Sequence, residues 1–190
     1  MNKIKIAIVG IGNCSSLYQG LHYYKDNNLS SGIIKKNIGG YDISDIEVVL
    51  AFDIDKRKVG KNLKNAIIEK PNCTPLFIEI DKIEDGPIVF MGKILDGISD
   101  IMNNYPEDER FCISDKVELF FNEIVNLLKD NSIDILINYL PVGSQRATEF
   151  YAECCLQSNT SLLNCIPVFI ASDPIWDQKF VELYEELSYK

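Results

Sequence analysis

The sequence lacks a long apolar run and has a single histidine, His22, among its 190 residues. No stretch is long enough to span a bilayer, and the chain enters an apolar strand too early to carry a secretory signal peptide.

No C-x-x-C pair occurs, so the sequence predicts no zinc site or other metal centre. We assign no catalytic role to His22 or to the paired cysteines at 154 and 155. Scattered cysteines are typical of reduced thiols in a cytoplasmic protein, which is the location we expect. The cysteines are Cys14, Cys73, Cys112, Cys154, Cys155 and Cys165.

Positive charge is also scarce. The chain has 19 lysines and arginines against 28 aspartates and glutamates, a formal net charge of −9. Nucleic acids and anionic membrane surfaces attract basic patches, so this balance argues against both as partners. The hydrophobic fraction of 46% is too high for a disordered chain. These values indicate a soluble globular protein with one sizeable core, or one domain plus an extension.

A glycine turn near the start of the chain gives the first indication of a ligand. The apolar run at 4–9 leads directly into Gly10, Ile11 and Gly12, and a stretch compatible with a helix follows. In a dinucleotide-binding turn the first glycine permits a tight turn, and the second lets a pyrophosphate approach the backbone. The helix then directs free N–H groups at the phosphates. The third glycine of the usual motif is replaced by Ser15, whose hydroxyl can donate to a phosphate oxygen. The alternative is a tight turn without a ligand.

Stretches typical of strands and helices alternate along the rest of the chain. This order predicts an α/β fold with a doubly wound parallel sheet, a Rossmann-like domain over 1–190 whose strand ends open on one ligand-binding edge. A polar, glycine-rich stretch at about 26–45 is predicted to be an inserted loop. The expected strands lie at 46–52, 76–80, 88–90, 133–139 and 161–166. The expected helices lie at 66–69, at 117–128 with Asp115 and Glu118 as a capping box, at 144–158, and after Ser172 or Asp173 with Pro174 in the first turn.

A carboxylate at the end of the second strand, Asp53, fits the same ligand. Such a carboxylate accepts both hydroxyls of an adenine ribose and repels a 2′-phosphate, which favours NAD over NADP. The spacing from Gly12 is about twice the usual 20 residues, and the inserted loop accounts for the excess. The alternative for Asp53 and for Asp55 is a cap on the following turn, which we favour for Asp55 only. Lys56 and Arg57 leave NADP as a lesser alternative.

Two later loops complete the candidate cofactor site. The loop at 139–144 borders the nicotinamide half of a cofactor in a doubly wound sheet. There Pro141 and Gly143 stiffen and expose the backbone, and Ser144 can donate or cap a helix. The loop at 164–173 is apolar, which suits a floor under a cofactor ring or a packing surface for another domain. The alternatives are an ordinary turn with a serine cap for the first loop and plain core packing for the second.

Together these motifs resemble one family, the myo-inositol-1-phosphate synthases, and above all its archaeal and actinobacterial branch. The resemblance runs nearly from end to end, and its most specific parts are the loops at 139–144 and 167–174. The matching stretches are AIVGIGNC at 7–14, QG at 19–20, YY at 23–24, DIE at 45–47, AFDID at 51–55, KVG at 58–60, LDG at 95–97, YLPVGS at 139–144 and PVFIASDP at 167–174.

The resemblance implies that both late loops contact NAD and that the loop at 26–45 is a family insertion. It also implies that the residues after Gly12 form the family's own version of the glycine turn. The predicted NAD-binding residues are Gly10, Gly12, Asn13, Cys14, Ser15, Asp53, Tyr139, Pro141, Gly143, Ser144 and Pro167.

The family converts glucose 6-phosphate into inositol phosphate by NAD-dependent oxidation, intramolecular aldol closure and reduction. The resemblance therefore implies an NAD-dependent isomerase with glucose 6-phosphate as substrate and a homo-tetrameric assembly. The family's catalytic lysines belong to a Gly-Asp-Asp-x-Lys segment expected beyond Lys190, so no catalytic residue is assigned. We expect the chain to be the NAD-binding part without the catalytic and oligomerisation domain, and not to complete the reaction alone. The alternatives are a non-catalytic, regulatory NAD-binding module and one half of a split enzyme.

Overall fold

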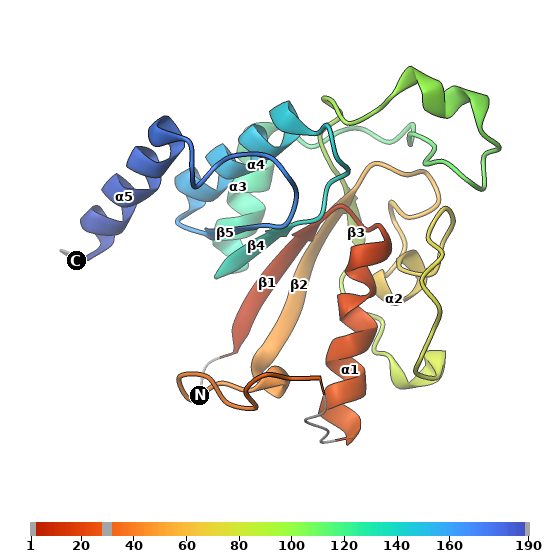
Figure 1. Cartoon of the computed structure of the whole chain (residues 1–190), viewed down its shortest axis with the longest axis horizontal. Helices are drawn as coiled ribbons and strands as arrows, with labels where there is room; N and C mark the ends of the chain where they lie inside the picture. Colours follow the sequence, from red (N-terminus) through yellow and green to blue (C-terminus); the bar gives the residue numbers. More distant parts are fainter. Residues whose placement is uncertain (1–2, 28–31, 189–190) are drawn as a thin grey trace.

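The computed structural model describes residues 3–27 and 32–188, and it shows strands and helices in alternation (Figure 1). This order confirms the predicted α/β fold. The strands are β1 (Ile4–Val9), β2 (Ile46–Asp53), β3 (Val89–Met91), β4 (Ile135–Asn138) and β5 (Ser161–Asn164). The helices are α1 (Leu17–Asn27), α2 (Leu63–Ala66), α3 (Phe121–Asp130), α4 (Gln145–Ser158) and α5 (Pro174–Ser188). Short 3₁₀ turns lie at η1 (Asn13–Ser16), η2 (Ile43–Asp45), η3 (Ile80–Lys82) and η4 (Asp100–Asn104).

The described strands form one parallel, five-stranded sheet in the order β3-β2-β1-β4-β5. β1 lies in the middle, where Ile8 is opposite Ala51 of β2 and Ile137 of β4. The chain adds strands first on one side of β1 and then on the other, so the strand order reverses between β1 and β4. Such a reversal opens a crevice at the carboxyl ends of the strands, where ligands of this fold class bind. The doubly wound parallel sheet is therefore confirmed.

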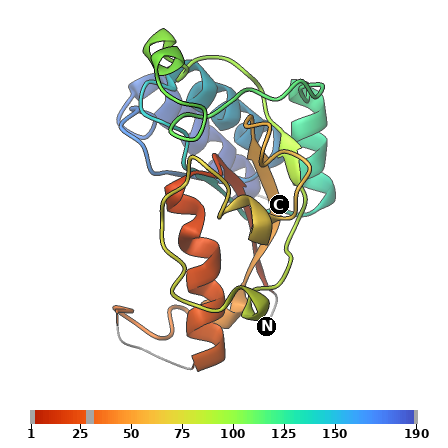
Figure 2. The same ribbon diagram turned by 90° about the vertical axis from the view of Figure 1, so that its right-hand side faces the viewer.

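Helices cover both faces of the sheet (Figure 1 and Figure 2). In β1, Ile6 and Ile8 join a buried cluster with α1 and α2, whereas Ala7 and Val9 join a cluster with α3 and α4. This alternation follows from the two-residue period of a strand. None of these four side chains is more than 3% exposed. Burial on both faces explains why the end of β1 is continuously apolar in the sequence.

The start of α3 differs from the prediction. Asp115 and Glu118 do not form a capping box, because the helix begins later, after Phe120. The Glu118 carboxylate instead accepts the N–H of Ile94, in the loop after β3, at 3.0 Å. Glu123 takes the capping role and accepts the N–H of Phe120 at 2.7 Å. The local spacing of acids matched a cap, but a partner distant in sequence holds Glu118 in a loop.

The strand expected at 76–80 is wrong. This segment attaches to α1 through the buried side chain of Gln19 rather than to a neighbouring strand. The Gln19 amide donates to the carbonyl oxygen of Pro75 at 3.2 Å and accepts the N–H of Phe77 at 3.2 Å. The backbone groups that a strand would pair are thus partly satisfied by one side chain.

The helix expected at 66–69 lies earlier in the chain. Asn62 caps α2 by accepting the N–H of Asn65 at 3.0 Å, so the helix starts at Leu63 and ends at Ala66. A capping side chain determines where the first free N–H groups are satisfied, and therefore where the helix begins.

The predicted insertion at 26–45 is described only in part, since residues 28–31 lie outside the described residues. Its last residues form η2. The side chain of Asp42 accepts the N–H of Ser44 at 2.7 Å and thereby caps this turn directly before β2.

The last third of the chain follows the predicted order, with strands a few residues shorter than expected. Asp173 caps α5 by accepting the N–H groups of Ile175 at 2.9 Å and Trp176 at 3.3 Å. α5 lies at the outer end of the molecule (Figure 1), where Lys179 pairs with Glu153 of α4 at 2.9 Å. None of the described helices is both long and apolar enough to cross a membrane.

Gly10→Ala is expected to lower the free energy of unfolding by about 2 kcal/mol or more. Gly10 has a φ of +87°, and an added Cβ would lie 2.6 Å from the carbonyl oxygen of Tyr139. Urea unfolding followed by circular dichroism measures the loss. Gly12→Ala is the matched control, because no atom lies within 4 Å of a Cβ at Gly12. Equal losses in the two variants would contradict the role assigned to Gly10.

Candidate functional site

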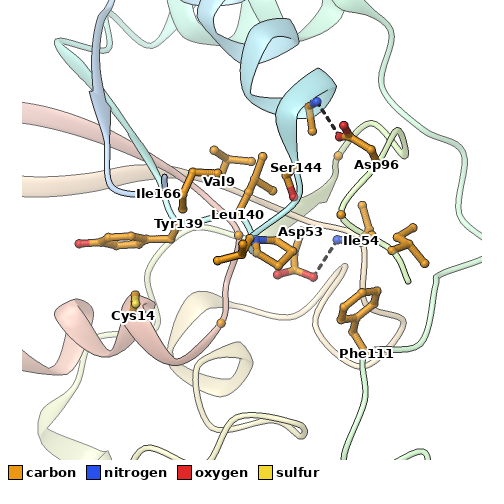
Figure 3. A pocket seen from close by; sticks show the side chains of 18 of the residues that line it. Val9, Cys14, Asp53, Ile54, Asp96, Phe111, Tyr139, Leu140, Ser144 and Ile166 are labelled. Atoms are coloured by element: carbon orange, nitrogen blue, oxygen red, sulfur yellow. Dashed lines mark hydrogen bonds between the residues drawn. The ribbon is translucent and has the colours of Figure 1, made fainter. Parts of the chain in front are cut away.

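A cavity of about 450 Å³ opens at the carboxyl edge of the sheet, where the glycine turn meets the loops after β2, β3, β4 and β5 (Figure 3). Ser15 and Gly143 do not line it, although the sequence predicted both as binding residues. The other predicted NAD-binding residues do line it, and their role in binding stays a prediction. They are Gly10, Gly12, Asn13, Cys14, Asp53, Tyr139, Pro141, Ser144 and Pro167.

The two glycines of the turn have different structural roles. The N–H of Gly10 donates to the carbonyl oxygen of Phe52 at 2.9 Å, and the positive φ of Gly10 turns the chain sharply off β1. Gly12 has a φ of −86°, which any residue can adopt, and open space where a side chain would lie. Gly10 is therefore required by the backbone, whereas Gly12 leaves room at the cavity.

The backbone N–H and C=O groups of Ile11, the residue between the glycines, both bond to side chains distant in sequence. Its N–H donates to Oδ2 of Asp53 at 2.6 Å. Its carbonyl oxygen accepts Nζ of Lys58 at 2.7 Å and Nδ2 of Asn72 at 3.1 Å. Lys58 and Asn72 were not predicted as site residues, because their role depends on partners far along the chain. The nearest signal is KVG at 58–60, which matched the family without a residue role.

The first backbone N–H groups that follow Ile11 are not used within the described part of the chain. In the part of the chain that the structure describes, the N–H groups of Gly12, Asn13 and Cys14 have no acceptor. The hydroxyl of Ser15 is fully buried and donates to the carbonyl oxygen of Gly12 at 2.5 Å. Oδ1 of Asn13 accepts the N–H of Cys73 at 2.8 Å, so this side chain fastens a second loop to the turn. The donors that remain are those of the backbone.

Asp53 braces the turn as well as facing the cavity. Oδ1 accepts the N–H groups of Ile54 and Asp55, each at 2.7 Å, and Oδ2 accepts that of Ile11. An ionised carboxylate has about four acceptor positions, so one position on Oδ2 remains. Asp53 can still accept a ribose hydroxyl, but the bracing role was not foreseen from the sequence.

The loop after β4 leaves one buried hydroxyl without a partner. The N–H of Ser144 donates to the carbonyl oxygen of Pro141 at 3.2 Å, and Ser144 is 1% exposed. Its Oγ has no hydrogen-bond partner among the described residues, although it lines the cavity. The alternative of an ordinary turn with a serine cap is not supported, since the Ser144 side chain forms no capping bond to α4. A buried hydroxyl without a partner costs free energy that a ligand can recover.

Asp96, in the loop after β3, caps α4 in place of Ser144. Its carboxylate accepts the N–H groups of Arg146 at 2.7 Å and Ala147 at 3.0 Å. Figure 3 labels Asp96 and shows one hydrogen bond from it to the start of α4. The next residue, Gly97, has a φ of +79°, and a Cβ there would collide with Oγ of Ser144. This cap joins two walls of the cavity. The sequence offered only the LDG motif at 95–97 as a signal, without a role.

The loop after β5 combines the two interpretations left open by its apolar sequence. Cys165, Ile166 and Pro167 line the cavity, as a floor for a ligand would. Val168 and Ile170 are buried in a cluster with α4 and α5, as plain core packing requires. Ile166 has both positions, because it lines the cavity and also packs against this cluster.

Asp55 has the structural role favoured from the sequence. It is fully buried and accepts the N–H groups of Arg57 at 2.8 Å and Cys112 at 2.9 Å, in addition to the Arg57 guanidinium. Burial alone would raise the pKa of Asp55, but these donors outweigh burial and lower it. Lys56 pairs with Glu107 at 3.2 Å. Neither Lys56 nor Arg57 lines the cavity, so neither supports NADP.

The side chains of His22, Cys154 and Cys155, to which the sequence assigned no catalytic role, lie in the core. His22 is 7% exposed, and its ring lies edge-on to that of Tyr18 at 4.8 Å. Burial raises the pKa of the Cys154 thiol to about 12 and also raises that of Cys155, which disfavours the nucleophilic thiolate. All six cysteines are free. Within residues 3–27 and 32–188, no cluster of three histidine, cysteine or acidic side chains could hold a metal ion.

Curated relatives match the chain over nearly its whole length, although no family model matches it. The inositol-3-phosphate synthase of Mycolicibacterium smegmatis is 40% identical over 186 residues, covering 94% of this chain and 47% of that protein. The enzyme of that name from Mycobacterium tuberculosis H37Rv is 39% identical over 185 residues, covering 95% and 47%. The one from Corynebacterium glutamicum is 38% identical over 183 residues, covering 94% and 48%. The chain thus spans about half the length of these relatives.

Solved structures with the same fold cover a similar share. The crystal structure of Ari2 matches with a TM-score of 0.75 and 27% identity over 96% of this chain and 50% of that one. A myo-inositol-1-phosphate synthase-related protein from Thermotoga maritima matches with a TM-score of 0.68 and 19% identity, covering 96% and 52%. The second likeness shows the fold alone.

Asp96→Ala is expected to lower the free energy of unfolding by about 1 kcal/mol, because two N–H groups of α4 lose their acceptor. Asp96→Asn keeps one carbonyl acceptor and should lose less. Urea unfolding measures both. Asp108→Ala, an exposed acid outside the cavity, is the control and should match the wild type. If Asp96→Ala also matches it, the cap contributes nothing.

Asp55→Asn is expected to lose about 2 kcal/mol or more at pH 7, because a buried charged partner of Arg57 is removed. The pKa of Asp55 is lower in the folded chain than its unfolded value of about 3.9. Its contribution is therefore present above about pH 4 and lost as the pH falls through the folded pKa. Urea unfolding from pH 7 to pH 3 should show a smaller acid loss in Asp55→Asn than in the wild type. Asp108→Asn is the control, and equal slopes in the wild type and Asp55→Asn would refute this role.

Proposed function

Because this chain belongs to the inositol-3-phosphate synthase family over the half of those proteins that it spans, we propose that its cavity binds NAD. The observation that carries this proposal is a set of donors that have no acceptor among the described residues and that surround one open space. The backbone N–H groups of Gly12, Asn13 and Cys14 lie on one side. The buried hydroxyl of Ser144 lies on another. A polar ligand with several acceptors satisfies both sets.

The phosphates of the dinucleotide fit the start of η1. Free N–H groups and the positive end of the following helix favour an anion at this position. A Cβ at Gly12 would meet no atom within 4 Å, so the backbone is open to a bulky group. The charged groups of NAD would therefore meet backbone donors rather than the hydroxyl of Ser15, which the turn already uses.

The adenine ribose fits Asp53, which keeps one acceptor position on Oδ2. Its negative charge disfavours a 2′-phosphate. Lys56 and Arg57 do not offset this charge at the cavity, since Arg57 bonds to Asp55 and Lys56 pairs with Glu107. NAD is therefore the proposed cofactor rather than NADP.

Apolar side chains form the walls that planar rings need. Leu95 and Ile98, in the loop after β3, line the cavity. Phe111 also lines it, as do Leu140 after β4 and Ile166 after β5 (Figure 3). In a doubly wound sheet with this strand order, Leu95, Ile98 and Phe111 suit the adenine ring. Leu140 and Ile166 suit the nicotinamide ring. Such walls exclude water from the rings.

The reaction proposed for the whole assembly is the one that the family resemblance implies, conversion of glucose 6-phosphate into inositol phosphate. When bound, NAD supplies a hydride acceptor that returns the hydride within one turnover. This chain's residues bind and orient that group. Among the described residues, the lysines at the cavity are Lys58 and Lys93. Lys58 bonds to the glycine turn, and Lys93 pairs with Glu118 at 2.8 Å, so neither is assigned to sugar chemistry.

Isothermal titration calorimetry with NAD tests the proposal. The wild type is expected to bind NAD at least about ten-fold more tightly than NADP, because Asp53 repels a 2′-phosphate.

Gly12→Ala should weaken NAD binding by about ten-fold or more while the chain stays folded, since its methyl enters the open space. Ser144→Ala should lose up to about ten-fold, the value of one neutral hydrogen bond. Ser172→Ala, an exposed serine outside the cavity, is the control. A folded wild type that binds no NAD would refute the proposal.

A further inference from the structure

Lys58 is a buried cation that the proposed binding mode does not yet use. It is 3% exposed and lines the cavity, and Nζ donates to the carbonyl oxygen of Ile11 at 2.7 Å and to Oδ1 of Asn72 at 2.9 Å. Both acceptors are neutral. Burial lowers the pKa of Lys58, against the pull of the Asp53 and Asp55 carboxylates. Among the described residues, no acid forms an ion pair with Lys58.

A buried ammonium without an ion pair costs stability, so its retention calls for a physical reason. The hydrogen bonds that Lys58 makes do not require a charge, because Nδ2 of Asn72 already donates to the same carbonyl oxygen of Ile11 at 3.1 Å and a neutral donor could also satisfy Oδ1 of Asn72. A neutral donor thus suffices to satisfy that carbonyl group. What Lys58 adds is positive charge at the edge of a cavity.

The peptide that joins Ile11 to Gly12 connects this charge to the ligand site. In a planar trans peptide the C=O and the following N–H point in opposite directions. Lys58 and Asn72 fix the C=O on one side, so the N–H of Gly12 points to the other. Within the described residues this N–H has no acceptor, and Gly12 lines the cavity.

The charge on Nζ also strengthens that donor. Hydrogen bonds from a charged group are stronger than neutral ones, and a cation at the carbonyl end polarises the peptide in a low-dielectric interior. The N–H of Gly12 therefore becomes a better donor to an anion than it would be beside Asn72 alone. An uncharged ligand group would gain much less.

We propose that Lys58 is a positioning residue for the phosphate groups of the bound ligand, acting through the peptide between Ile11 and Gly12. This inference rests on the proposed function, because it requires a ligand that carries phosphate at the glycine turn. The role assigned to Lys58 is to hold and polarise the Gly12 N–H, not to contact the sugar substrate.

The test compares a charged ligand with a neutral one of the same base. Calorimetric titrations of the whole chain with ADP and with adenosine give the ratio of the two affinities. Lys58→Met is expected to reduce this ratio by about ten-fold, while the affinity for adenosine changes less than about two-fold. Lys58→Arg, which keeps the charge, should retain more of the ratio than Lys58→Met. Lys56→Met, a lysine of the same turn that does not line the cavity, is the matched control and should keep the wild-type ratio.

Several outcomes would overturn the inference. Equal losses for ADP and adenosine in Lys58→Met would assign Lys58 to folding only, and unchanged affinities would remove any role. If thermal unfolding shows that Lys58→Met does not fold, Lys58→Gln, which keeps a neutral donor, is titrated instead under the same criteria. Unfolding of both variants would likewise assign Lys58 to the fold. A wild type that binds neither NAD nor ADP would instead refute the proposed function itself.

Discussion

The backbone N–H and C=O groups of Ile11 connect the glycine turn to the rest of the site. Asp53, at the end of β2, takes the N–H of Ile11, and Lys58 and Asn72 take its carbonyl oxygen. The turn is thereby fixed from both sides by side chains beyond the strand that carries it. With the Ile11 groups satisfied, the N–H groups that follow are the ones left to meet a ligand. The contacts of Ile11 thus determine which backbone N–H groups remain available at the cavity.

A second set of contacts holds the opposite wall. Asp96 caps α4 from the loop after β3, so two hydrogen bonds tie this loop to the start of α4, which follows the loop after β4. Gly97 makes room for the Ser144 hydroxyl, which stays buried and unpartnered in the described chain. Supporting contacts of this kind keep a binding site near its bound geometry before the ligand arrives. The preorganised donors are therefore held from two independent directions.

The net charge of the whole chain and the local charges at the cavity act over different distances. A formal net charge of −9 disfavours nucleic acids and anionic surfaces, which sense the field of the whole molecule. The cavity instead presents backbone N–H groups, a helix start and the buried ammonium of Lys58. These act over a few ångströms in a low-dielectric setting, where nearby charges outweigh distant ones. An acidic protein can in this way offer an anion site.

Two errors of the sequence predictions, the capping box at Asp115 and Glu118 and the strand at 76–80, have the same cause. Asp115 and Glu118 have the spacing of a cap, yet Glu118 bonds to the loop after β3. The stretch at 76–80 has strand composition, yet the side chain of Gln19 takes its backbone groups. In each case a partner distant in sequence replaced the local choice, and local spacing carries no record of that partner.

The sequence by itself determined the strand and helix order, the need for glycine at position 10 and the loops that meet at the sheet edge. Apolar periodicity, helix caps and the left-handed backbone at Gly10 are local properties, so they can be read along the chain. Only the tertiary structure decided that Asp53 braces the turn, that Lys58 and Asn72 share a carbonyl, and that Asp96 caps α4. These contacts join residues between 42 and 61 positions apart. They determine which donors stay free for a ligand, and such a balance exists only once the chain has folded.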